Sequence, residues 1–212
     1  MDMSDQTVRY RPFEDGDFEG LVPIMQGLWH TKRDDVEFSR LEAEDDLAHM
    51  LSKANFSQVA LVDDAVCGIV LARAGEIEPA WLARWQGVQD RAREEMRALS
   101  PEHYAEFMAF VEGEGSTNRG LLEASGLAGG GEVVLLALSP AARGLGVGRA
   151  LVEAARAHLA VRGALPGYLY TDTSCTWQFY EHLGFTRAAE HIATPEEQGI
   201  IEPEMYLYRL DA

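Results

Sequence analysis

The sequence predicts an α/β fold of the α+β kind, in which strands and helices follow one another within a single domain of residues 1–212. Two observations lead to this prediction. Short segments of strand-like hydrophobic pattern are interspersed with segments whose apolar residues recur every three or four positions. The chain also has 47% hydrophobic and 25% charged residues, which is ordinary for a globular domain. A stretch at about residues 76–130 carries only helical patterns, so we expect it to be a helical insertion between the third and fourth strands.

The N-terminal part predicts three strands and two helices. An alternating strand at 7–13 leads into the acidic turn 14–17, whose carboxylates can cap a first helix. Ser39 and Glu42 have the spacing of a capping box, which predicts that a second helix begins there and runs to about residue 53. Two apolar strands then follow, joined by a two-aspartate turn typical of a β-hairpin. These strands are expected at residues 57–62 and 65–72.

The insertion predicts three helices, of which the third is short. Aromatic and aliphatic residues from Trp81 to Leu99 mark one helical face, and Ser100-Pro101 has the cap and first-turn proline that start another helix. A third helix is expected at 121–124, before a run of glycines. The aromatic residues here either form the core of an added helical layer or wall a pocket as a lid.

Strand and helix patterns resume after the insertion. A strand at 132–139 is apolar throughout, as expected of a strand buried on both faces. It runs through a glycine-rich turn into an amphipathic helix, and shorter elements complete the chain. The remaining elements are expected to be a helix at 144–161, a strand at 167–171, a helix at 175–182, a strand at 185–191, a loop at 194–204 and a strand at 205–210.

The charge excludes several classes of partner. Lys and Arg number 18 against 35 Asp and Glu, which gives a formal net charge of −17. We therefore expect no nucleic-acid partner and no anionic membrane surface, because both need clustered basic residues. The longest uncharged apolar run, at 133–142, is about half of a membrane span, and the N-terminus lacks a secretory signal pattern. These features predict a cytoplasmic protein.

The segment from Leu138 to Ala150 carries the clearest chemical signal. A buried strand leads into three glycines spaced by single residues, and these lead directly into a helix. The first N–H groups of a helix have no internal partner, and they lie at the positive end of the helix dipole. Such a turn binds a phosphate or pyrophosphate, and Arg143 and Arg149 flank it in an otherwise acidic chain.

Two common nucleotide-binding patterns do not fit this segment. A dinucleotide fingerprint needs a glycine where Arg149 stands, and a Walker A loop needs a lysine after the glycines. The pattern R-G-x-G-x-G instead resembles the coenzyme A pyrophosphate loop of the GCN5-related N-acetyltransferases (GNATs). Residues 179–185, Phe-Tyr-Glu-His-Leu-Gly-Phe, are similar to a second signature of that family. The tight resemblance covers residues 132–185, and the insertion has no counterpart in it.

The resemblance implies a mixed, mostly antiparallel sheet flanked by helices, and acetyl-CoA as co-substrate. It implies that the end of the fourth strand splays from its neighbour and bonds to the pantetheine arm through its backbone, while the loop holds the pyrophosphate. It also places Thr173 where many members carry an asparagine that contacts the cofactor, so the residue type at this position departs from the family pattern. The cofactor-binding residues so implied are Leu136, Ala137, Leu138, Ser139, Arg143, Gly144, Leu145, Gly146, Val147, Gly148, Arg149 and Thr173.

Two residues are candidates for the chemistry. Tyr180 stands at the position of the family's tyrosine near the thioester sulfur, where a phenol can protonate the departing thiolate. An alkylammonium must lose a proton before it attacks, and Glu132 stands where some members carry a catalytic glutamate. Two simpler readings remain open: Tyr180 as a packing residue and Glu132 as a charged end of a loop.

The resemblance implies acetyl transfer to a primary amine by direct attack in a ternary complex. The acidic composition favours a small cationic acceptor. Acetylation of a protein N-terminus or lysine, and a non-catalytic acyl-CoA-binding module, are the alternatives; a homodimer is possible. Cys67 and Cys175 form no disulfide framework, and the histidines lack metal-binding spacing, so we expect no metal.

Overall fold

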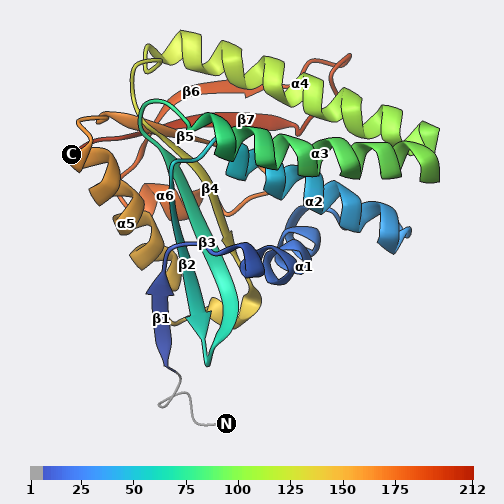
Figure 1. Ribbon diagram of the computed structural model, residues 1–212. Coiled ribbons are helices and arrows are strands. Elements are labelled where there is room, and N and C mark those ends of the chain that lie inside the picture. Colours follow the sequence, from blue (N-terminus) through green and yellow to red (C-terminus); the bar gives the residue numbers. More distant parts are fainter. Residues whose placement is uncertain (1–6) are drawn as a thin grey trace.

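The computed structural model describes residues 7–212, and its seven strands form one sheet in the order β1-β2-β3-β4-β5-β7-β6 (Figure 1). Neighbouring strands are antiparallel except for β4 and β5, which run parallel. The mixed, mostly antiparallel sheet that the resemblance implies is therefore confirmed. The strands are β1 (Val8–Arg11), β2 (Phe56–Val62), β3 (Ala65–Arg73), β4 (Glu132–Leu138), β5 (Gly167–Asp172), β6 (Thr186–Ile192) and β7 (Glu204–Leu210).

Six α-helices flank this sheet. Figure 1 shows α5 on one side, α1, α2 and α3 on the other, and α4 across β6 and β7. The helical insertion between β3 and β4 is present, as expected. The helices are α1 (Phe18–Trp29), α2 (Val36–Ser52), α3 (Pro79–Leu99), α4 (Pro101–Ser125), α5 (Val147–Val161) and α6 (Gln178–His182).

Two local predictions were wrong. Helix α2 begins at Val36 rather than Ser39, because Asp35 caps it by accepting a hydrogen bond from the Phe38 N–H at 3.0 Å. The Ser39 hydroxyl instead accepts a hydrogen bond from the Gln26 side chain at 2.8 Å. The short third helix of the insertion does not exist separately, since α4 continues without a break to Ser125 and ends at Gly126 in a left-handed conformation.

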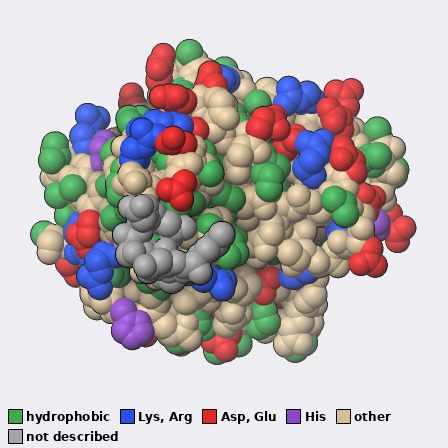
Figure 2. Space-filling model, turned by 90° about the horizontal axis from the view of Figure 1, so that it is seen from below, with side chains coloured by type: hydrophobic (Ala, Val, Ile, Leu, Met, Phe, Trp, Pro, Cys, Tyr) green, Lys and Arg blue, Asp and Glu red, His purple; other side chains and the backbone are tan. Residues whose placement is uncertain are grey.

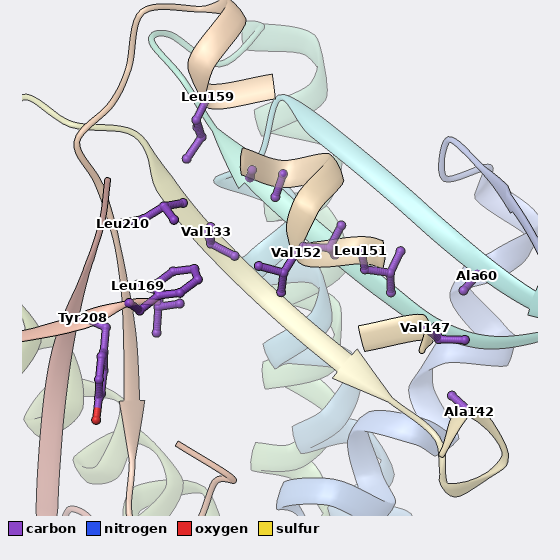
Figure 3. Packing of buried hydrophobic residues seen from close by; sticks show 14 of the residues in the cluster. Ala60, Val133, Ala142, Val147, Leu151, Val152, Leu159, Leu169, Tyr208 and Leu210 are labelled. Atoms are coloured by element: carbon purple, nitrogen blue, oxygen red, sulfur yellow. The ribbon is translucent and has the colours of Figure 1, made fainter. Parts of the chain in front are cut away.

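The face of the sheet covered by α5 has a continuous apolar core. Val147, Leu151 and Val152 are fully buried and point from α5 toward the strands, as Figure 3 shows. They pack with Val133 of β4 and Leu169 of β5, so α5 spans the junction of the two parallel strands. Burying such side chains contributes about 1.5–3 kcal/mol each, which fixes α5 and the loop before it against the sheet.

Helix α4 connects two different parts of the opposite face. Its first half packs on α2 and α3 through Phe107 and Val111, whereas its second half packs on β5 and β7 through Leu121. The segment between these contacts, 112–120, contains no hydrophobic side chain. Helix α4 therefore crosses from the N-terminal half of the sheet to the C-terminal half.

The surface carries charges of both signs. On the face shown in Figure 2, Asp and Glu side chains lie among Lys and Arg side chains rather than in a single block. In the part of the chain that the structure describes, none of the helices has the length and apolar character needed to cross a membrane.

Candidate active site

The sheet opens between its two parallel strands. Strands β4 and β5 share a single paired position, Glu132 with Tyr168, and diverge from there toward their carboxyl ends. Strand β4 stays paired with β3 along its length, apart from a bulge at Val134. The splayed neighbour that the resemblance implies is thus present in the backbone.

Along a strand, the backbone N–H and C=O groups of successive residues point alternately to the two neighbouring strands, and this alternation determines which residues of β4 face the opening. The Ser139 N–H donates to the Cys67 carbonyl at 2.8 Å, so Ser139 and, two residues earlier, Ala137 direct their backbone groups toward β3. The backbone groups of Leu136 and Leu138 therefore point into the opening between β4 and β5. Of the four residues expected to pair with a pantetheine arm, only these two present free backbone groups.

The loop after β4 exposes a row of N–H groups at the same end of the sheet. Gly146 caps α5 in a left-handed conformation, with φ of 72°, and Gly144 has φ of 76°. The first hydrogen bond of the helix joins the Ala150 N–H to the Gly146 carbonyl, at 3.1 Å. The N–H groups from Gly146 to Arg149 precede that turn, so they remain available to an anion.

The side chains of the loop suit this arrangement. Arg143, Gly144 and Arg149 are exposed, whereas Leu145 is half-buried and Val147 fully buried. The two guanidinium groups add positive charge to the positive end of α5. The loop can therefore hold a pyrophosphate with backbone donors and two arginines.

A close contact joins this loop to the second signature. A Cβ on Gly148 would lie 2.9 Å from Leu138 Cδ1 and 3.2 Å from Phe179 Cζ. A larger residue at position 148 would require the Leu138 and Phe179 side chains to shift, because α5, β4 and α6 approach closely here. The two signatures, 30 residues apart, are therefore in direct contact.

Tyr180 lies on α6 against an aromatic wall. Its ring centroid is 5.5 Å from that of Phe179, 5.6 Å from Phe185 and 6.3 Å from Tyr208. Burial raises the pKa of the Tyr180 phenol, and the nearby Cys175 and Asp172 raise it further. The hydroxyl is thus near the carboxyl end of β5 and is protonated at neutral pH.

Glu132 lies at the closed end of the opening and is ion-paired. Its Oε2 is 2.6 Å from Arg73 Nη2 and 3.5 Å from the Tyr168 hydroxyl, and only 9% of the residue is exposed. That oxygen is already occupied by two donors. The arrangement joins β3, β4 and β5 where the strands begin to diverge.

The carboxyl end of β5 forms the other rim of the opening. Thr173 is exposed here, and its N–H donates to the Glu204 carbonyl at 3.1 Å, so this N–H is directed to the first residue of β7. Thr171 is 7% exposed, and its Oγ1 has no hydrogen-bond partner within residues 7–212. The sequence pattern gave no reason to single out Thr171, because an isolated threonine in a strand is usual.

Acidic side chains surround this rim on the face covered by α4. Glu114 of α4 is partly exposed, and burial raises its pKa to about 7. The charged groups that influence this pKa are Asp46 of α2, Lys53 after α2, Asp172 of β5 and Glu202 of the β6–β7 loop. Sequence reasoning missed this residue, although its place within a polar stretch of an otherwise amphipathic helix was a visible signal.

The other polar candidates have structural explanations or lie apart. His182 is exposed on α6, and Cys67 is buried in the α5 core. Cys175 is half-buried and free, and burial raises the pKa of its thiol. Among residues 7–212 there is no group of three or more His, Cys, Asp or Glu side chains arranged to hold a metal ion.

Comparison with known families gives one match. Residues 105–187 match the family model described as the acetyltransferase (GNAT) domain. The matched segment begins inside α4 and includes the loop after β4 and the whole of α6.

Curated relatives match over a shorter segment. A mycothiol acetyltransferase of Thermobispora bispora is 48% identical over 59 residues, which are 27% of this chain and 20% of that protein. A mycothiol acetyltransferase of Geodermatophilus obscurus is 42% identical over 65 residues, or 30% of this chain and 21% of that protein. The chain thus spans about a fifth of the length of these relatives.

Solved structures share the fold over nearly the whole chain. The polyamine N-acetyltransferase of Drosophila melanogaster superposes with a TM-score of 0.60 at 11% identity, covering 97% of this chain and 100% of that chain. The ribosomal-protein-S18-alanine N-acetyltransferase of Escherichia coli gives 0.54 at 12% identity, covering 96% and 93%. At such identities the likeness concerns the fold alone. The segment of this chain that matches the acetyltransferase (GNAT) domain, residues 105–187, contains the splayed strand, the glycine loop and α6 in one connected site.

Proposed function

We propose that this protein transfers an acetyl group from acetyl-CoA to a primary amine by direct attack in a ternary complex. The observation that carries the proposal is the opening between β4 and β5, with the free N–H groups of α5 at its wide end. When those N–H groups bind the pyrophosphate, the pantetheine arm is positioned along the free backbone groups of Leu136 and Leu138. The thioester then lies between β4 and the rim that carries Tyr180.

The proposed reaction needs an acid for the leaving group. The amine nitrogen attacks the thioester carbonyl, the C–N bond forms, and the C–S bond breaks. Tyr180 gives its proton to the thiolate, whose pKa is about 8–9, and regains one from the attacking nitrogen. Its apolar ring contacts support this role, since they hold the hydroxyl in one place.

The proposed acceptor is a small cationic amine. Asp172 and the partly ionised Glu114 provide negative charge beside the opening, whereas Asp46 and Glu202 are paired with His30 at 3.5 Å and with Lys32 at 2.8 Å. An amine that carries a second ammonium group gains from such charge, whereas a neutral or acidic substrate does not. Helix α4 crosses this side, which favours a small molecule over a folded protein segment.

The first test is calorimetric titration with acetyl-CoA, followed by thiol-release assays with n-butylamine and 1,4-diaminobutane. We expect binding, release of free CoA with both amines, and a lower KM for the diamine. Binding without thiol release from either amine contradicts amine acetylation and favours a protein acceptor or a non-catalytic module. An absence of binding removes the proposed function altogether.

A pair of loop variants tests the pyrophosphate site. Gly146→Glu places a carboxylate at the N-terminus of α5, so we expect it to abolish acetyl-CoA binding through repulsion of the pyrophosphate. Gly146→Asn is the matched control: it adds a side chain at the same left-handed position, where asparagine is tolerated better than most residues, without adding charge. We expect this control to retain most of the affinity measured by calorimetry. Equal binding by both variants would contradict the assignment of the loop.

A further inference from the structure

We propose that Glu114, on the insertion helix α4, accepts the proton that the amine substrate must lose before it attacks. This inference rests on the proposed acetyl transfer and assigns its base. The proton acceptor must be a carboxylate or another base near the thioester. Asp172 at the rim is already engaged, because its Oδ1 accepts hydrogen bonds from the Ser174 N–H at 2.7 Å and the Ser174 hydroxyl at 2.6 Å. Glu132 and Glu114 are two carboxylate candidates that differ in their surroundings.

Glu132 is the weaker candidate because its carboxylate is already ion-paired with Arg73. Its Oε2 is bonded to Arg73 at 2.6 Å, and Tyr168 approaches the same oxygen. An ammonium substrate would have to displace or compete with the guanidinium to deliver its proton there. Arg73 and Glu132 are directly opposite residues at the paired end of β3 and β4, which is a structural position.

The course of α4 brings Glu114 to the open end. Leu121 and Leu122 of α4 pack with Tyr168 and Tyr170 of β5. Glu114 lies seven residues before Leu121, about 10 Å along the helix toward the carboxyl end of β5. Asp172, the last residue of β5, is accordingly among the charged groups that influence the pKa of Glu114. The carboxylate therefore lies over the rim of the opening.

The middle of α4 is built for polar contact rather than for packing. A Cβ at Gly113 would lie 2.9 Å from Ile201 Cγ2, so the helix is held tightly against the β6–β7 loop at this point. One turn beyond Glu114, the Oδ1 atom of Asn118 is fully buried and has no hydrogen-bond partner within residues 7–212. Buried polar atoms are normally paired, so this side of the helix faces a site that a polar ligand or water fills.

The charges around Glu114 suit a base for an ammonium ion. Glu114 has no ion-pair partner in the described part of the chain, and the charged groups that influence its pKa are the carboxylates named above and Lys53. Burial raises its pKa to about 7 from 4.5. Such a carboxylate holds a proton about 300 times more tightly than an ordinary one and is still half ionised at neutral pH.

The proton balance is simple. The ammonium of the substrate gives one proton to the Glu114 carboxylate, and the free amine attacks the thioester carbonyl. The second nitrogen proton leaves as the C–S bond breaks and ends on the CoA thiolate through Tyr180. Glu114 returns its proton to solvent after the products leave, so one proton is released for each acetyl group transferred.

The test is the pH dependence of thiol release from acetyl-CoA, with 1,4-diaminobutane as the probe amine. The wild type should show an inflection near pH 7 in kcat, with activity rising as Glu114 ionises. Glu114→Gln should lose this inflection and lower kcat about 100-fold at pH 7.5, while acetyl-CoA affinity is unchanged. Glu114→Asp should keep the inflection at a reduced rate.

Glu112→Gln is the matched control, because Glu112 is an exposed carboxylate two residues away on the same helix. It should leave both the rate and the inflection unchanged, and Glu132→Gln should keep the inflection. If Glu114→Gln retains the inflection, or only raises KM, the assignment is overturned. Acetyl-CoA binding by the wild type without acetylation of the probe also overturns it, whereas failure to bind acetyl-CoA removes the proposed function itself.

Discussion

At the scale of single residues, the site combines groups whose surroundings push them toward different tasks. Burial raises the pKa of the Tyr180 hydroxyl, which is therefore protonated at neutral pH. Burial also raises the pKa of the Glu114 carboxyl to about 7. Glu132 is instead fixed by Arg73. Environment rather than residue type therefore separates the proposed proton donor, the proposed proton acceptor and a structural ion pair.

Removal of one hydroxyl tests the proton donor. We expect Tyr180→Phe to lower kcat by about 100-fold, since general acid catalysis contributes about 10²–10⁴-fold, and to leave the acetyl-CoA affinity nearly unchanged. Steady-state thiol release and calorimetry measure the two quantities. Tyr104→Phe removes a hydroxyl that pairs with Arg97 on the surface, at 2.9 Å, and should leave both unchanged. A normal rate in Tyr180→Phe would show that Tyr180 serves only in packing.

At the scale of secondary-structure elements, a glycine in α5 and a glycine in α4 have opposite effects on stability. Gly148 of α5 is required by the close approach of Leu138 and Phe179. Gly120 of α4 has nothing within 4 Å of the position where its Cβ would stand. The first glycine allows packing, whereas the second only weakens its helix.

This contrast predicts two substitutions of opposite effect on stability. Gly148→Ala should lower the free energy of unfolding by about 1–3 kcal/mol, because the added methyl overlaps Leu138 and Phe179. Gly120→Ala should raise it by up to about 1 kcal/mol through helix propensity alone. Chemical denaturation of both variants measures the difference. A Gly148→Ala protein as stable as the wild type would contradict the described contact between α5, β4 and α6.

At the scale of the whole molecule, an acidic protein keeps one buried cation. His30 is 3.7 Å from Glu42 and 3.5 Å from Asp46, and its side chain is 11% exposed. Burial opposes protonation, but the two neighbouring carboxylates outweigh it and raise the pKa of His30 to about 9. The imidazolium ties the end of α1 to α2.

The raised pKa predicts how stability depends on pH. The folded state binds this proton more tightly than the unfolded state, where the pKa is about 6.5. Its contribution, up to about 3 kcal/mol, is therefore full below pH 6.5 and is lost as the pH rises through about 9. Thermal unfolding at pH 6 and pH 9 should show a fall in Tm for the wild type and a smaller fall for His30→Gln. An equal fall in both proteins would assign the effect to other groups.

Much of the fold could be predicted because it depends on neighbours in sequence. The hairpin turn at Asp63 and Asp64 takes the left-handed φ values, 50° and 67°, that such a turn requires. The predicted start of α2 was wrong because two residues, Asp35 and Ser39, can each cap a helix there, and the folded chain uses Asp35. The end of the insertion was misread because its glycines and polar residues, 112–120, conceal that α4 is one helix.

The sequence by itself determined the strand, glycine loop and helix of the proposed anion site, because these follow one another within a few residues and follow local rules. It also determined the second signature on α6. Only the tertiary structure decided the tasks of the carboxylates. Arg73 meets Glu132 across 59 positions, and Glu114 reaches the β5 rim only because α4 packs on both halves of the sheet. Charge and burial at a site depend on contacts between distant segments, and these contacts exist only in the folded chain.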